Sequence, residues 1–187
     1  GVGKTTIVRK VCKRLQDLGV PIQGFYTEEV RAAGRRTGFD VVTLGGNRGK
    51  LARVGTDSLS GHKSRYSVGQ YSVMLEDFEQ IALPVLQVHT DKGQVRPVYV
   101  IDEIGKMEMF SSSFVQTVRS LTAHVGSTVL ATIPIAKGRP IPLVEELRHS
   151  ADAKLVVVKY LLCLRKSVYD IVNNIYIIMS IFTTCLE

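Results

Sequence analysis

The first residues of the chain are of the types that bind phosphate. Gly3, Lys4 and Thr5 match the second half of the pattern G-x-x-x-x-G-K-[ST]. In such a loop, backbone N–H groups at a helix N-terminus surround the phosphates, the lysine reaches the β- and γ-phosphates, and the hydroxyl holds Mg²⁺. The sequence therefore predicts a magnesium ligand in Thr5 and a nucleotide-binding loop made of Gly1, Val2, Gly3, Lys4, Thr5 and Thr6.

An acid pair follows a short apolar run later in the chain. VYVID (98–102) is typical of a buried parallel strand that ends on Asp102. An isolated carboxylate there is costly without a cation, so Asp102 is the second predicted Mg²⁺ ligand. Glu103 is expected to face the other side of a strand that continues past Asp102, where it can deprotonate a water in line with the γ-phosphate. The predicted catalytic residues are Glu103 and Lys4.

Further side chains can assist this chemistry. Thr132 is predicted at the tip of a neighbouring strand, where its hydroxyl can contact the water or the γ-phosphate. A positive side chain would stabilise the charge of the transition state. The sequence does not choose among the candidates for that role, which are Arg31, Arg35, Arg36, Arg48, Arg53, Arg139 and Lys106.

The elements that must position these residues alternate between helices and strands. Apolar residues at helical spacing predict a helix over 5–18 that stops at Gly19. Two strands joined by AAGRR predict a β-hairpin over 21–44. Such an alternation, with continuous apolar strands, predicts an α/β domain over residues 1–159 with a mostly parallel sheet. The other expected strands are 51–55, 98–102, 127–133 and 153–158, and the other expected helices are 76–89, 111–124 and 142–149.

The composition limits the class of protein and its partners. The 187 residues suffice for one sizeable domain, and the net charge of +7 suits an anionic partner. The three cysteines form no C-x-x-C pair, and the basic residues among the first twenty exclude a signal-peptide core. Basic residues are spread along the chain without interleaved aromatics, which speaks against specific nucleic-acid binding. We expect an intracellular protein, cytoplasmic or also nuclear, that is monomeric and binds no membrane.

Several segments together resemble the thermophilic-type P-loop NTPase family, from residue 1 to about residue 157. The segments are GVGKTT (1–6), GFYTEEVR (24–31), GRRTGFDVVTL (34–44), VGQY (68–71), FEQIALPVL (78–86) and VIDEIGKME (100–108). The resemblance implies a three-layer α/β/α P-loop fold related to AAA+ and RecA-like ATPases. It also implies slow, Mg²⁺-dependent hydrolysis of ATP, GTP and other nucleoside triphosphates to the diphosphate and phosphate.

The resemblance is incomplete at both ends. The family begins with a strand and a complete phosphate loop, so we expect this chain to lack the first strand. Because that strand is central, its neighbours would have unpaired edges, each buried unsatisfied backbone group costing roughly 1–3 kcal/mol. We therefore expect a chain that is unstable or inactive unless another strand substitutes.

The last segment, 160–187, has a different character. IVNNIYIIMSIFTTCLE is apolar and nearly without charge, and we expect a divergent C-terminal segment prone to aggregate. A final core helix is the alternative, whereas a membrane span would need roughly 20 mostly apolar residues and this stretch holds two asparagines.

Two other functions stay open at this stage. A nucleotide-kinase-like phosphotransferase would share the loop and would need an acceptor pocket near the 24–44 hairpin. A nucleotide-binding protein without activity would follow from truncation. Because Glu103 comes directly after the metal-binding acid, hydrolysis is the preferred hypothesis.

Overall fold

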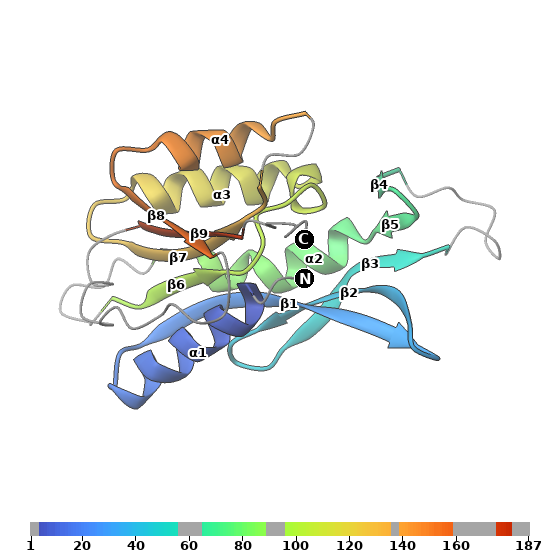
Figure 1. The fold of residues 1–187 in the computed structure, drawn as a ribbon, viewed down its shortest axis with the longest axis horizontal. Helices are drawn as coiled ribbons and strands as arrows, with labels where there is room; N and C mark the ends of the chain where they lie inside the picture. Colours follow the sequence, from blue (N-terminus) through green and yellow to red (C-terminus); the bar gives the residue numbers. More distant parts are fainter. Residues whose placement is uncertain (1–3, 56–64, 89–95, 136–138, 159–174, 181–187) are drawn as a thin grey trace, which may run out of the picture.

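A computed structural model gives the fold of residues 4–55, 65–88, 96–135, 139–158 and 175–180 (Figure 1). The strands are β1 (Ile22–Ala32), β2 (Arg35–Thr43), β3 (Arg48–Val54), β4 (Ser67–Val68), β5 (Tyr71–Val73), β6 (Val98–Ile101), β7 (Thr128–Ile133), β8 (Ala153–Val158) and β9 (Ile175–Ser180). The helices are α1 (Lys4–Asp17), α2 (Leu75–Ala82), α3 (Ser112–Ala123) and α4 (Pro142–His149), with short 3₁₀ turns at Pro84–Leu86 and Glu108–Phe110.

The described strands form one mixed sheet in the order β4-β5-β3-β2-β1-β6-β7-β9-β8. Neighbours from β4 to β1 are antiparallel, whereas neighbours from β1 to β8 are parallel. The predicted hairpin is the β1–β2 pair, and the predicted parallel sheet is the other half. The sheet is thus mixed, because the hairpin continues into β3 and β5 without a crossover.

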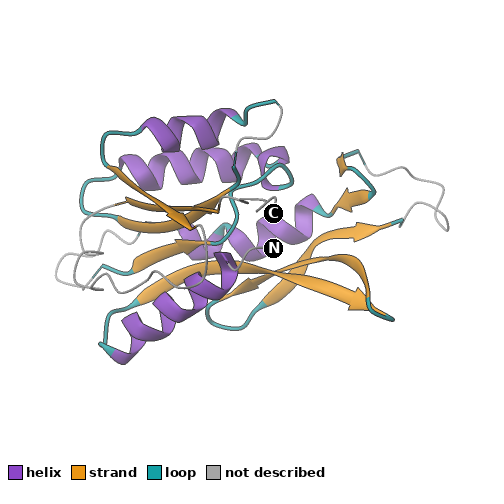
Figure 2. Cartoon of the chain, in the orientation of Figure 1, coloured by secondary structure: helices purple, strands orange, loops and turns teal. Residues whose placement is uncertain are grey.

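Helices cover both faces of the sheet (Figures 1 and 2). The apolar stripe of α1 packs on one face of β6, whose Val98 and Val100 lie in the same cluster as Ile7 and Leu15. The alternate residues Tyr99 and Ile101 belong to the larger core that contains residues of α2, α3 and α4. The three-layer α/β/α arrangement follows directly from this alternation along a strand that is buried on both faces.

Close approach of β1 to β6 depends on one glycine. Gly24 has φ +129°, and a β-carbon there would lie 2.0 Å from the carbonyl oxygen of Val100. No larger residue fits without moving one of the two strands. Since β6 carries Asp102 at its end, Gly24 helps to fix the position of that acid relative to the hairpin.

The predicted helices end where their sequence signals indicate. The helix α1 ends just before Gly19, which adopts φ +72°. Helix α2 stops before Pro84, and the Ser111 hydroxyl caps α3 by accepting a hydrogen bond from the Phe114 N–H at 2.9 Å. The boundaries of α1, α3 and α4 agree with the sequence expectations within one residue, whereas α2 ends at Ala82, well before the expected end at 89.

The strand β9 comes from the segment expected to be divergent. Its residues pair in parallel with β7 on one side and with β8 on the other, for example Ile177 with Ala131 and with Leu155. A strand therefore does occupy the position between β7 and β8, and the expected unpaired edges are not observed there. Residues 175–180 are accordingly neither a final helix nor a membrane span. Among the described residues, no helix has the length and apolar character to cross a membrane.

Candidate nucleotide site

The start of α1 and the end of β6 meet at a direct side-chain contact. The Thr5 hydroxyl donates a hydrogen bond to Oδ2 of Asp102 at 2.5 Å, across a separation of 97 residues. Lys4, in the first turn of the same helix, is close enough for its charge to lower the pKa of both Asp102 and Glu103. The structure thus brings together the two segments whose chemistry the sequence singled out. Gly1, Val2 and Gly3 lie outside the described residues.

Asp102 is a buried acid, only 1% exposed, held from two sides. Its Oδ1 accepts a hydrogen bond from the Thr132 hydroxyl at 2.8 Å, while Oδ2 accepts from Thr5. Burial raises the pKa of Asp102, and the hydrogen bonds from Thr5 and Thr132 together with the charge of Lys4 offset part of that increase. Such a site favours a cation, since a positive charge would stabilise the ionised form of Asp102.

Glu103 lies in a turn and not in a continuing strand. Its φ is +81°, which is unusual for a residue with a side chain and costs about 1–3 kcal/mol. Its N–H donates to the Thr132 hydroxyl at 2.8 Å, so one threonine holds both acids in place. The expectation of an extended strand past Asp102 is wrong because β6 ends at Ile101 and the backbone turns.

Thr132 contacts both acids in this structure. Its hydroxyl donates to Asp102 and accepts from the Glu103 N–H, and its side chain is fully buried. A hydroxyl has one proton to donate, and this one is already directed at Asp102. Thr132 is therefore a positioning residue for the acid pair in this structure.

Glu108 is a third acid beside the site that sequence reasoning missed. Its Oε2 accepts a hydrogen bond from the Gly105 N–H at 3.0 Å, and the residue is 2% exposed. Burial, together with the charge of Glu103, raises the pKa of Glu108 to about 8. A β-carbon at Gly105 would lie 3.1 Å from Glu108 Oε2 and 3.5 Å from Glu103 Oε1, so both carboxyl groups converge on this glycine. The one sequence signal for Glu108 is its place in the segment DEIGKME, which also contains Asp102 and Glu103.

Most of the candidate arginines are engaged in ion pairs of the hairpin. Arg31 and Arg36 both pair with Glu29, and Arg36 also lies over the Phe39 ring. Arg48 pairs with Glu28 and Asp40, and Arg53 pairs with Asp40. Of these four, Arg36 is close enough to lower the pKa of Glu103.

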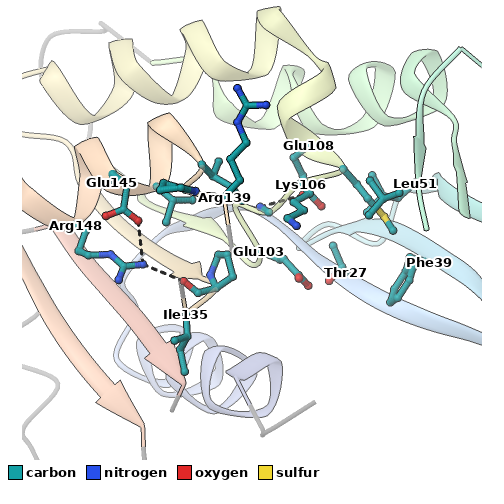
Figure 3. A pocket seen from close by; sticks show the side chains of 17 residues that line it. Thr27, Phe39, Leu51, Glu103, Lys106, Glu108, Ile135, Arg139, Glu145 and Arg148 are labelled. Carbon is teal, nitrogen blue, oxygen red and sulfur yellow. Dashed lines mark hydrogen bonds and ion pairs between the residues drawn. The ribbon is translucent and has the colours of Figure 1, made fainter. Parts of the chain in front are cut away.

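A cavity of about 340 Å³ opens beside Glu103 (Figure 3). Its lining includes Glu103, Lys106 and Glu108 from the turn after β6, and Arg139 and Arg148 from around α4. The opposite wall carries Thr27, Phe39 and Leu51 from the hairpin and β3. Two candidate cations, Lys106 and Arg139, thus share a cavity with the predicted base.

The residues at this site fit a magnesium ion. The Thr5 hydroxyl and the Asp102 carboxylate provide hard oxygen donors. Within the described part of the chain, no cluster of three or more His, Cys, Asp or Glu side chains could hold a metal. Mg²⁺ is usually held by one or two carboxylates together with substrate phosphates and water.

Comparison with known proteins identifies the family. Residues 1–169 match the family described as NTPase. The chain belongs to the NTPase family. The human cancer-related nucleoside-triphosphatase is 54% identical over 156 residues, which cover 83% of this chain and 82% of that protein. The nucleoside-triphosphatase THEP1 of Aquifex aeolicus is 40% identical over 160 residues, which cover 83% of this chain and 84% of that protein.

Solved structures of NTPase relatives share the fold. The solution structure of a human cancer-related nucleoside triphosphatase matches with a TM-score of 0.67 and 54% identity, covering 79% of this chain and 78% of that one. The crystal structure of THEP1 from Aquifex aeolicus matches with a TM-score of 0.62 and 39% identity, covering 80% of this chain and 79% of that one. The predicted P-loop α/β fold is confirmed, and hydrolysis of nucleoside triphosphates is the activity that the comparisons support.

Proposed function

We propose that this chain hydrolyses nucleoside triphosphates, ATP and GTP among them, to the diphosphate and phosphate with slow, Mg²⁺-dependent turnover. The observation that carries the proposal is the hydrogen bond between Thr5 and Asp102, which joins the start of α1 to the end of β6. Glu103 follows immediately, beside a cavity. Family membership and the names of the relatives support the same activity.

The triphosphate binds at the N-terminus of α1. In this proposal, backbone N–H groups of residues 1–6 donate to phosphate oxygens, and the positive end of the helix dipole favours their negative charge. Lys4 approaches the β- and γ-phosphates. Its charge also lowers the pKa of Asp102 and Glu103, which supports a place for Lys4 beside the acid pair.

Thr5 and Asp102 would hold Mg²⁺ through their oxygens. When bound, the ion neutralises charge that builds up on the phosphate oxygens. Thr132 keeps the Asp102 carboxylate oriented by its hydrogen bond. The short contact between Thr5 and Asp102 brings both donors to one place without any ligand.

Glu103 acts as the general base. Burial raises the pKa of Glu103, which makes its carboxylate a stronger base. Glu103 takes a proton from water as the water oxygen bonds to the γ-phosphorus. The bond to the bridging oxygen breaks, and its electron pair leaves with the nucleoside diphosphate.

Replacing Glu103 with glutamine tests the mechanism. The amide keeps the size of the side chain but cannot accept the proton, so kcat for phosphate release should fall about 10²–10⁴-fold. Release is measured with ATP and GTP in the presence of Mg²⁺. Glu76→Gln, an exposed position in the first turn of α2, is the matched control and should keep wild-type turnover. Unchanged turnover in Glu103→Gln would reject the assigned base.

A further inference from the structure

The cavity beside Glu103 is larger than one attacking water requires. Its volume is about 340 Å³, whereas one water needs roughly 10–15 Å³ of such volume. This size lies within the range of small-molecule sites, which begins at about 300 Å³. The cavity next to the base therefore has room for more than the attacking water.

The cavity walls favour an occupant with an apolar body. Phe39 and Leu51 form the wall towards the hairpin (Figure 3), and the other apolar lining residues are Ile135, Ile141 and Val144. Leu51 and Val144 are each 2% exposed, and they hold this surface in place as part of the main core. Phe39, Ile135 and Ile141 are partly exposed, so a ligand seated against them gains by covering apolar surface.

Polar groups of the cavity are incompletely satisfied. Among the described residues, no donor forms a hydrogen bond to the Glu103 carboxylate, and its backbone is strained at φ +81°. The Arg148 Nε is a buried nitrogen without a hydrogen-bond partner in the described part of the chain. Strain and unpaired buried polar atoms of this kind mark sites that a ligand completes.

The base at this cavity suits a nucleophile that has a proton to lose. Three carboxyl groups line the cavity, those of Glu103, Glu108 and Glu145, and three cations line it as well, Lys106, Arg139 and Arg148. A phosphate acceptor would bring its negative charge next to Glu103, and its ionised oxygen would need no base. A hydroxyl has a proton to lose, and Glu103 can accept that proton.

We propose that the cavity binds an alcohol with an apolar body and that the enzyme transfers the γ-phosphoryl group to this alcohol in competition with water. This inference rests on the proposed function, since it uses the same triphosphate and the same base. The alcohol oxygen bonds to the γ-phosphorus and its proton passes to Glu103. The bond to the bridging oxygen breaks, its electron pair leaves with the nucleoside diphosphate, and the products are an alkyl phosphate and the diphosphate.

Partition of labelled phosphate between water and alcohol tests the inference. The protein is incubated with γ-labelled ATP, Mg²⁺ and either 2-phenylethanol or ethanol at equal concentrations, and alkyl phosphate and free phosphate are quantified. With an apolar acceptor site, 2-phenylethanol should yield at least about tenfold more alkyl phosphate than ethanol. The yield should saturate as the concentration of 2-phenylethanol increases. Ester formation that only follows the molar ratio of alcohol to water, or none at all, would overturn the inference.

A variant that fills the cavity tests whether alkyl phosphate is formed there. Ile141→Trp should lower the ratio of phenethyl phosphate to free phosphate at least about tenfold, whereas Val125→Trp should leave that ratio unchanged. Val125 is 89% exposed and does not line the cavity. An unchanged ratio in Ile141→Trp would also overturn the proposed site.

The wild type distinguishes failure of the two proposals. If it releases no phosphate from ATP or GTP at all, the proposed hydrolysis fails. If it releases phosphate but forms no alkyl phosphate, only the acceptor site is refuted.

Discussion

At the scale of single residues, the site depends on how one threonine and one glycine hold three acids together. The Thr132 hydroxyl bridges the Asp102 carboxylate and the Glu103 N–H, and Gly105 leaves room for Glu103 and Glu108. These five residues contact one another, so removing one polar partner leaves another unpaired. The resulting predictions differ in what they measure.

Thr132→Val should damage the acid pair. The valine keeps the shape but leaves the Glu103 N–H and one Asp102 oxygen without their partner, at a cost of about 1–3 kcal/mol. We expect kcat for phosphate release to fall about 10–100-fold together with this loss of stability. Thr128→Val at the other end of β7 is the matched control and should keep wild-type kcat. Equal kcat values for both variants would contradict the positioning role of Thr132.

Glu108 should make the stability of the protein depend on pH. Its folded-state pKa of about 8 exceeds the ordinary value of 4.5, so the folded protein holds a proton that the unfolded chain has lost between these values. The free energy of unfolding therefore falls as the pH rises from about 4.5 to about 8, by an amount on the order of a few kcal/mol. Glu108→Gln should remove most of this fall.

Urea unfolding of wild type and Glu108→Gln at pH 5, 6, 7 and 8 measures the effect. The free energy of unfolding of the variant, relative to that of the wild type, should increase steadily as the pH rises. The reason is that the amide cannot ionise and still provides an oxygen that accepts from the Gly105 N–H. Glu76→Gln provides the comparison, since that side chain is exposed. Parallel pH profiles for wild type and Glu108→Gln would contradict the assigned ionisation.

The contact between Thr5 and Asp102 was predictable from sequence, whereas the surroundings of Glu103 were not. A lysine-threonine pair at a helix start and an acid at the end of an apolar strand have a known chemical relation, so their types and order suffice. The turn at Glu103 and the burial of Glu108 depend on packing between elements distant in sequence. No local pattern encodes such packing, and Glu108 alone in the sequence is indistinguishable from a surface acid.

At the scale of elements, the strands with strong patterns were predictable and the short or uniform ones were not. Two strand-like stretches on either side of the turn at Ala33 and Gly34 identified the β1–β2 hairpin. The strands β4 and β5 are two and three residues long, too short for a period to be recognised. The strand β9 lies in a uniformly apolar segment where strand and helix cannot be told apart by periodicity.

Removal of β9 should destabilise the protein. A chain that ends at residue 174 exposes the edges of β7 and β8 that β9 covers on both sides. We expect a loss of about 3 kcal/mol or more, which for a domain of this size lowers the melting midpoint by roughly 6–12 °C. A chain that ends at residue 180 keeps β9 and is the matched control. Equal midpoints for the two shortened chains would show that β9 contributes nothing to stability.

At the scale of the whole molecule, the protein is basic and its substrate is a polyanion. The net charge of +7 favours association with a triphosphate at low ionic strength, and the described hairpin uses several arginines in ion pairs of its own. Net charge was readable from composition, but it does not reveal which cations remain available. That distinction needs the pairing of side chains in three dimensions.

Substrate binding should stabilise the entire fold. At a concentration of Mg²⁺-ATP about 100-fold above Kd, linkage adds about 2.7 kcal/mol to the free energy of unfolding. The melting midpoint should rise by roughly 5–10 °C, and Lys4→Ala should abolish most of the rise. Lys10→Ala, at an exposed position of the same helix, should retain it. A full rise in Lys4→Ala would exclude the lysine from the phosphate site.

The order of the strands in the sheet has a consequence for how the chain is made. The ribosome releases β7 and β8 well before β9, although β9 belongs between them. Until Ile175–Ser180 emerges, two rows of backbone amides and carbonyls are open to any extended peptide nearby. Nascent chains of this protein should therefore be clients of cellular chaperones until Ile175–Ser180 has emerged from the ribosome.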